Sequence, residues 1–252
     1  MNIMIIFAAG LLPVILLFVY IFHKDAHPEP ANQLLCATLL GAVIVIPVSF
    51  VEAGVQLILL GDAEMEAYSL VDCAVDAFCV AAIPEEAFKL LALWIFLRRN
   101  AFFDEHYDGI VYAVCVSLGF AGIENVLYLF DNMDDWQTVA ILRALLAVPG
   151  HYAFAVLMGY YYSRYHFGGR HTSDAIKTLA MPVLAHGIYD TIAFSQQLDT
   201  VIGSISFVIL IAFCIWMHRF AQNRIKEQVA RDKDFDDQRN NMPPNNWTFP
   251  RG

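Results

Sequence analysis

Charged residues are scarce in this sequence of 252 residues: they make up 16% of it, against about 25% in an ordinary soluble domain. A basic excess is absent too, because the formal net charge is −10, and this excludes a conventional nucleic-acid binder. Paired cysteine motifs are missing: the five cysteines lie singly within apolar runs, which excludes a disulfide scaffold. Apolar residues make up 58% of the chain, and this composition predicts a membrane protein.

Seven apolar runs are long enough to cross a bilayer, which takes a helix of about 20 residues. They lie near residues 3–22, 34–60, 69–97, 109–130, 138–163, 177–195 and 201–218. We therefore expect an all-α fold, a polytopic transmembrane helix bundle of about seven spans that fills residues 1–220. Pro84 is expected to kink the third run or to divide it into two pieces, so that a count of eight stays open.

Basic residues indicate how the bundle is oriented. All but two of the fifteen Lys and Arg residues lie in the turns after the first, third and fifth runs or in the C-terminal tail. By the positive-inside rule the N-terminus lies outside and the C-terminus lies in the cytoplasm. Residues 221–252 are charged and then rich in Asn and Pro, and they are expected to form a short helical extension and a disordered cytoplasmic tail.

Ionisable side chains within the spans mark a candidate site, because each costs at least about 2.5–3.5 kcal/mol at the bilayer centre. These ionisable residues are Glu85, Glu86, Lys89, Glu124, His151, His186 and Asp190, and the polar Asn125 lies next to Glu124. Counted from the cytoplasmic helix ends at about 1.5 Å per residue, they fall in one layer near mid-membrane. Lys89 follows Glu85 by four residues and Asp190 follows His186 by four, so each pair shares a helical face.

The residue types in this layer suit hydrolysis. Two imidazoles and a carboxylate can hold a divalent metal, and a further carboxylate can act as the general base that activates water. His151, His186 and Glu124 therefore form a candidate ligand set, with Glu85 or Glu86 as the proton acceptor. A metal-free reaction stays open, in which a carboxylate activates water while histidine and asparagine stabilise the oxyanion.

Other residues in the runs are expected to have structural roles. Arg143 is expected to extend to the lipid headgroups, and Asp72 and Asp76 are expected to be solvated at an entrance. Gly119 and Gly159 are among the glycines that are expected to let helices approach closely around the site.

The motifs that carry these residues resemble those of one family. The segment PEEAFKLLA resembles the EExxK motif of the PrsW family of intramembrane proteases, and FAGIENVLYL resembles its FxxxEN stretch. His151 with the helix after it, and the segment AHGIYD, are similar to the third and fourth motifs of that family. The resemblance covers about residues 80–195 and extends to the wider superfamily that includes the CAAX prenyl endopeptidases.

This resemblance implies a role for each residue of the layer. Glu85 and Glu86 would activate water, while Glu124, His151 and His186 would bind a divalent metal, zinc in the first instance, or orient the water. Lys89 and Asn125 would support the site, and Asp190 stands where CAAX enzymes have asparagine. The implied activity is cleavage of a membrane-anchored protein, an anti-sigma factor in the best-known cases, in the bacterial inner membrane.

Two other functions would use the same polar cavity. An ion-coupled or proton-coupled transporter also places acids and histidines within its spans, although such transporters usually carry an internal repeat, and none stands out here. A non-catalytic scaffold would bind a membrane helix in the cavity without cleaving it. The sequence predicts a lipid bilayer and a membrane protein as partners and no nucleic acid, and it leaves the oligomeric state open.

Overall fold

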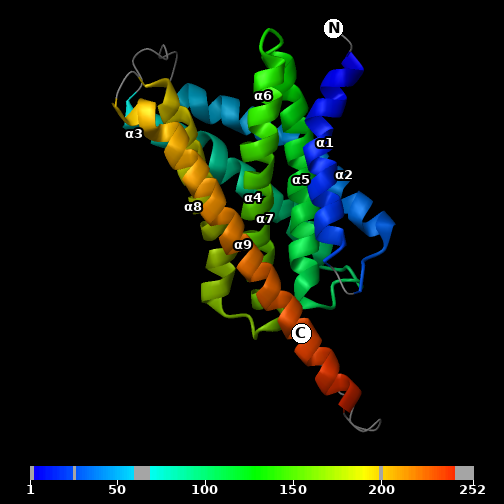
Figure 1. Cartoon of the computed structure of the whole chain (residues 1–252). Coiled ribbons are helices and arrows are strands. Elements are labelled where there is room, and N and C mark those ends of the chain that lie inside the picture. The colour runs from blue at the N-terminus through cyan, green and yellow to red at the C-terminus, as the bar shows by residue number, and fades with distance from the viewer. Residues whose placement is uncertain (1–2, 25–26, 60–68, 199–200, 242–252) are drawn as a thin grey trace.

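The computed structural model describes residues 3–24, 27–59, 69–198 and 201–241, and all regular secondary structure in these residues is helical (Figure 1). The elements are α1 (Ile3–Phe22), α2 (Ala31–Leu59), α3 (Leu70–Val75), η2 (Asp76–Ala82), α4 (Ile83–Leu97), α5 (His106–Asp131), α6 (Trp136–Leu142), η3 (Arg143–Ala147), α7 (Val148–Phe167), α8 (Thr172–Phe194), η4 (Ser195–Gln197) and α9 (Val201–Asn241). The predicted all-α class is confirmed.

Five helical segments are long and apolar enough to cross a membrane: α1, α2, α5, the continuous helix 136–167 and α9. The continuous helix 70–97 and α8 fall short of this, because they carry several of the polar residues of the predicted layer. Each of the seven predicted runs nevertheless coincides with one helical rod of the described structure. The chain is therefore a multi-pass helical membrane protein, and seven crossings remain a prediction.

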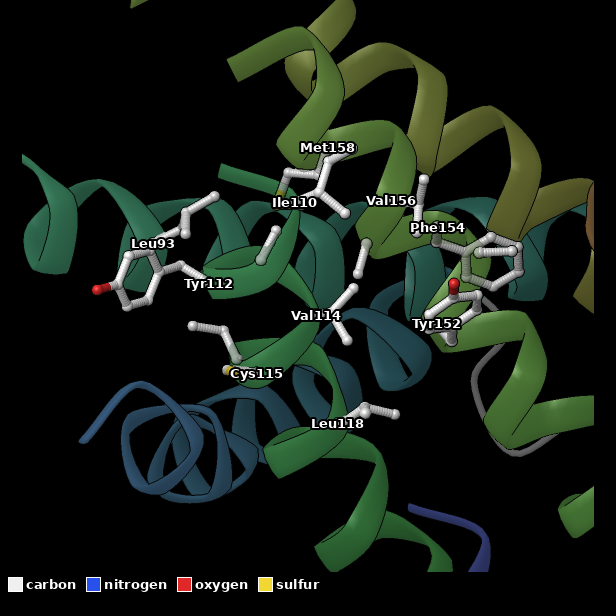
Figure 2. Close-up of a cluster of buried hydrophobic side chains, with 14 of the residues drawn as sticks. Leu93, Ile110, Tyr112, Val114, Cys115, Leu118, Tyr152, Phe154, Val156 and Met158 are labelled. Carbon is white, nitrogen blue, oxygen red and sulfur yellow. The ribbon is translucent and has the colours of Figure 1, made fainter. Parts of the chain in front are cut away.

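α5 forms the interior of the bundle. Of its most apolar stretch 83% is buried, against 22% for α1 and α9, whose large apolar side chains face outward as lipid-facing helices require. Figure 2 shows part of this core, where buried side chains of α4, α5 and α7 gather. A side chain at Gly119 would collide with the backbone of α2, and one at Gly159 with Gly109, so these glycines do bring α2 and α7 close to α5.

Two wide turns interrupt the α-helical pattern, and each lies directly before a proline. In η2 the amide of Ile83 donates to the oxygen of Phe78, and in η3 the amide of Val148 donates to the oxygen of Arg143, five residues back in both cases. Pro84 and Pro149 follow, and a proline ring clashes with the preceding turn of an ordinary α-helix. The π-helical turns absorb that clash, so Pro84 leaves the third rod continuous.

α9 runs diagonally across the bundle and continues beyond it (Figure 1). It stays helical to Asn241, further than the short extension that the sequence predicts. The reason is tertiary contact: Asp232 of α9 accepts hydrogen bonds from the amides of His106 and Tyr107, both 2.8 Å, at the start of α5. The rest of the predicted disordered tail, residues 242–252, lies outside the described residues.

Candidate active site

A cavity of about 690 Å³ lies among α2, η2, α4, α5, α7 and α8. Its wall holds Glu85, Glu124, His151, His186 and Asp190 of the predicted layer, and these five residues come from four separate rods. The wall also extends to Asp131 and to η4, at the ends of α5 and α8. In the predicted orientation these are the external ends of the spans, so the cavity leads from the outer side to mid-membrane.

Lys89 is the centre of the site. Its Nζ donates to Glu85 Oε2 at 2.8 Å and to Glu86 Oε1 at 2.9 Å, and it lies 3.2 Å from His151 Nδ1. The ring of Phe120 covers the ammonium at 4.3 Å. All three charged side chains are at most 5% exposed, and a buried cation of this kind requires such partners.

His151 links this group to α5. Its Nε2 lies 2.9 Å from Glu124 Oε2, and its backbone oxygen accepts a hydrogen bond from the Ser117 hydroxyl. The Nδ1 atom faces the Lys89 ammonium, which can only donate, so the proton of a neutral ring belongs on Nε2 and points at Glu124. The ring is therefore fixed from both sides.

His186 is held between two carboxylates. Its Nδ1 lies 3.0 Å from Glu86 Oε1, and its Nε2 lies 3.0 Å from Asp190 Oδ2, one turn further along α8. Its ring stacks on Phe154 at a centroid distance of 4.9 Å and meets the ring of His151 edge-on at 5.3 Å. The predicted pairing of His186 with Asp190 is present in the structure.

The donor atoms of Glu85, His151 and His186 lie within 4.8 Å of one another, and all three residues are buried. Two imidazoles and a carboxylate are a usual donor set for zinc. Next to them, Glu86 Oε2 is a buried carboxylate oxygen without a hydrogen-bond partner among the described residues, which a nearby cation would satisfy. The donor set therefore fits a divalent metal, although the Lys89 ammonium now contacts two of these three side chains.

Glu124 and Asn125 are turned toward Arg143. Arg143 donates from Nη2 to Glu124 Oε2 at 2.8 Å and from Nε to Asn125 Oδ1 at 2.6 Å, while Asn125 Nδ2 donates to the oxygen of Gly10 in α1. The prediction that Arg143 extends to the headgroups is wrong, because these two partners hold its side chain inward at 13% exposure. Glu124 lies beside the three-donor group and contacts it through His151.

One acidic residue within a span lines the cavity although it is not among the site residues predicted from the sequence. Glu52 of α2 is partly buried and lines the cavity, close enough to Glu85 and Glu124 for electrostatic repulsion. The signal that could have found it is the spacing of Ser49, Glu52 and Gln56, polar residues that share one face of an otherwise apolar helix. Of the two predicted entrance residues, Asp76 lines the cavity, whereas Asp72 forms the capping box of α3 with Ser69.

Comparison with known proteins matches the chain to one family. A family model described as PrsW family intramembrane metalloprotease matches residues 29–217. The chain is 36% identical over 191 residues to Protease PrsW of Oceanobacillus iheyensis, a match that covers 74% of this chain and 82% of that protein. It is also 36% identical over 190 residues to Protease PrsW of Bacillus subtilis, with the same two shares. No solved structure matches the chain.

Proposed function

This chain belongs to the PrsW family of intramembrane metalloproteases, and we propose that it hydrolyses a peptide bond of a membrane-anchored protein in the cavity described above. The observation that carries this proposal is the buried group of Glu85, His151 and His186, whose donor atoms face one another within 4.8 Å at the cavity wall. Hydrolysis within a membrane needs an activated water and a space that admits both water and peptide. The cavity provides the space, and the group of Glu85, His151 and His186 at its wall can activate the water.

Glu85 and Glu86 have different tasks in this proposal. Glu85 lines the cavity and belongs to the three-donor group, so it is the catalytic carboxylate. Glu86 is fully buried and does not line the cavity, and its Oε1 contacts both Lys89 and His186. Glu86 is therefore a positioning residue: it holds the Lys89 ammonium and, where no metal is bound to Nδ1, the imidazole of His186.

A divalent ion, zinc in the first instance, would be held by Glu85, His151 and His186. When bound, such an ion supplies Lewis-acid chemistry that lowers the pKa of a coordinated water. Glu124 and Asp190 accept from the outward ring nitrogens of the two histidines and so fix both rings, as carboxylates commonly do behind metal-binding imidazoles. Glu124 also lines the cavity, where its carboxylate can accept a proton from water.

A metal-free mechanism is the second candidate, and the position of Lys89 favours it. The ammonium already lies against Glu85 and His151 and supplies positive charge beside two of the side chains that would hold a metal ion. In this mechanism Glu85 accepts the proton of water directly, and the imidazole of His186 stabilises the oxyanion. The two mechanisms differ in whether Glu85 is needed to retain a metal.

The substrate class and the membrane follow from the family resemblance. We propose a substrate with a single membrane anchor, of the anti-sigma-factor kind, and a location in the bacterial inner membrane. Seven crossings with the C-terminus in the cytoplasm agree with the distribution of Lys and Arg. Residues 1–220 would form the membrane-embedded catalytic domain, and residues 221–252 the cytoplasmic tail.

The cleavage test uses single-span reporter proteins, co-expressed with the full chain, whose external segments next to the membrane vary in sequence. Wild type should shorten at least one reporter, with the cut located by mass spectrometry, and Glu85→Gln should abolish the cut. Asp134→Asn, which neutralises an exposed carboxylate outside the cavity, should leave it intact. Cleavage of no reporter by wild type, or equal cleavage by Glu85→Gln, would overturn the proposal.

The metal test measures bound zinc in detergent-purified wild type, Glu85→Gln, Glu124→Gln and a His151→Ala/His186→Ala double variant. The metal mechanism predicts near-stoichiometric zinc in wild type, its loss from Glu85→Gln and from the double variant, and its retention in Glu124→Gln. Zinc that stays in Glu85→Gln would remove Glu85 from the ligand set. Absence of zinc from active wild type would leave the metal-free mechanism.

A further inference from the structure

We infer that Glu52 determines substrate specificity by binding a Lys or Arg side chain in the external part of the substrate's membrane segment. This inference rests on the proposed function, because it names the substrate class of the same cavity. The argument uses the position of Glu52, the pairing of the cations around it, and the charge of the cavity mouth.

Glu52 lies on α2 about two turns before the end of the helix at Leu59. At about 1.5 Å per residue, its Cα is roughly 10 Å below that end, within the hydrocarbon depth of a bilayer. Neighbouring positions such as Phe50 and Ile58 are exposed and apolar, as expected of a lipid-facing helix. A carboxylate is costly at this depth, and it is tolerated where it faces a polar cavity and finds a partner there.

The basic groups near Glu52 are already paired. Lys89 binds Glu85 and Glu86, the ring of His186 lies between Glu86 and Asp190, and Arg143 binds Glu124 and Asn125. Arg143 is the one Lys or Arg among the described residues that line the cavity. The external turns 60–68 and 199–200 contain no Lys or Arg in their sequences. Within the described cavity, Glu52 therefore has no cation to pair with from this chain.

The mouth of the cavity carries the same sign of charge as Glu52. Asp76, Asp131 and Asp190 also line the wall, whereas its one described Lys or Arg, Arg143, is bound to Glu124. A low-dielectric cavity lined mainly by one sign of charge attracts the opposite sign, and a like charge placed opposite it costs several kcal/mol. A cationic side chain that enters from the external side would meet this acidic wall, to which Glu52 belongs.

The test measures binding to full-length protein that carries Glu85→Gln, so that bound peptide is not consumed. The probes are three synthetic peptides with one apolar span and, at one external position, Lys, Gln or Glu. With Glu52 present, the Lys peptide should bind about tenfold more tightly than the Glu peptide. Glu52→Gln should reduce this ratio to about twofold or less, and Glu52→Lys should reverse it. Asp134→Asn removes an exposed acid outside the cavity and should leave the ratio unchanged.

Equal binding of the three peptides to protein that retains Glu52 would overturn the inference, even if the Glu52 variants failed to fold. An unchanged ratio in a folded Glu52→Gln variant would overturn it as well. Cleavage of the peptides by wild type, measured in parallel, separates the two proposals. Binding that prefers Lys without cleavage would refute the proteolytic function and keep the role of Glu52, whereas cleavage without a preference for Lys would do the reverse.

Discussion

Replacement of Lys89 by methionine is the sharpest test of how the site is held together. Methionine keeps the length and apolar stem of the side chain but removes the ammonium that contacts Glu85, Glu86 and His151. The carboxylates of Glu85 and Glu86, both at most 5% exposed, would then repel each other without a cation between them. The variant isolates the charge, because the volume at this position is nearly conserved.

The expected cost follows from burial. Breaking a buried ion pair by removing one partner typically costs about 3–5 kcal/mol, since the other charge stays buried without compensation. Here one cation serves two carboxylates, so the upper part of that range applies. At about 2–4 °C per kcal/mol for a chain of this size, the midpoint of thermal unfolding should fall by on the order of 10 °C.

The measurement is thermal unfolding of purified wild type, Lys89→Met and the triple variant Lys89→Met/Glu85→Gln/Glu86→Gln in one detergent. Neutralising both carboxylates should recover most of the loss, because a buried ionic group can be replaced by neutral residues at little cost. Two results would refute the reasoning: a Lys89→Met midpoint within about 2 °C of wild type, or a triple variant no more stable than Lys89→Met.

Three further predictions use the same unfolding measurement. Asp232→Ala should cost about 1–2 kcal/mol by exposing two amides of α5, and Asp232→Asn should cost less; equal losses would contradict a capping role. Gly159→Val should destabilise by about 1–3 kcal/mol or more by forcing α7 from α5, whereas Gly54→Ala, which meets nothing within 4 Å, should not. Arg143→Met should cost about 1–3 kcal/mol, because Glu124 loses its partner, and adding Glu124→Gln should restore part of that loss. No recovery would contradict the pairing of Arg143 with Glu124.

The number and order of the helices could be predicted from the length of the apolar runs in the sequence. Seven runs of sufficient length predict seven helical rods, because a buried backbone in lipid must satisfy its hydrogen bonds within each helix. The far end of α9 was not predictable in this way. Its sequence is largely charged, with only Ala221, Ile225 and Val229 as apolar residues on the packed side, and it is also held by Asp232, whose partners in α5 lie 125 and 126 residues earlier in the chain.

The composition of the site was also largely predictable, but its pairing was not. The cost of burying charge identifies Glu85, Glu124, His151 and His186, and the structure gathers all four at one cavity. Which carboxylate faces which imidazole depends on side-chain directions across three helix interfaces. Arg143 shows the difference: its position near a helix end suggests lipid headgroups, yet Glu124 and Asn125 of α5 offer it two hydrogen bonds.

The two π-helical turns affect the direction of the later side chains more than their depth. Each wide turn places one additional residue in the helix before Pro84 or Pro149. An extra residue shifts later positions by only about 1.5 Å along the axis but by about 100° around it. Residues after each turn, Glu85 and His151 among them, therefore shift little along the helix axis but turn to another face. The face each presents differs from the one that a regular helix counted from the outer end would assign, and both residues line the cavity.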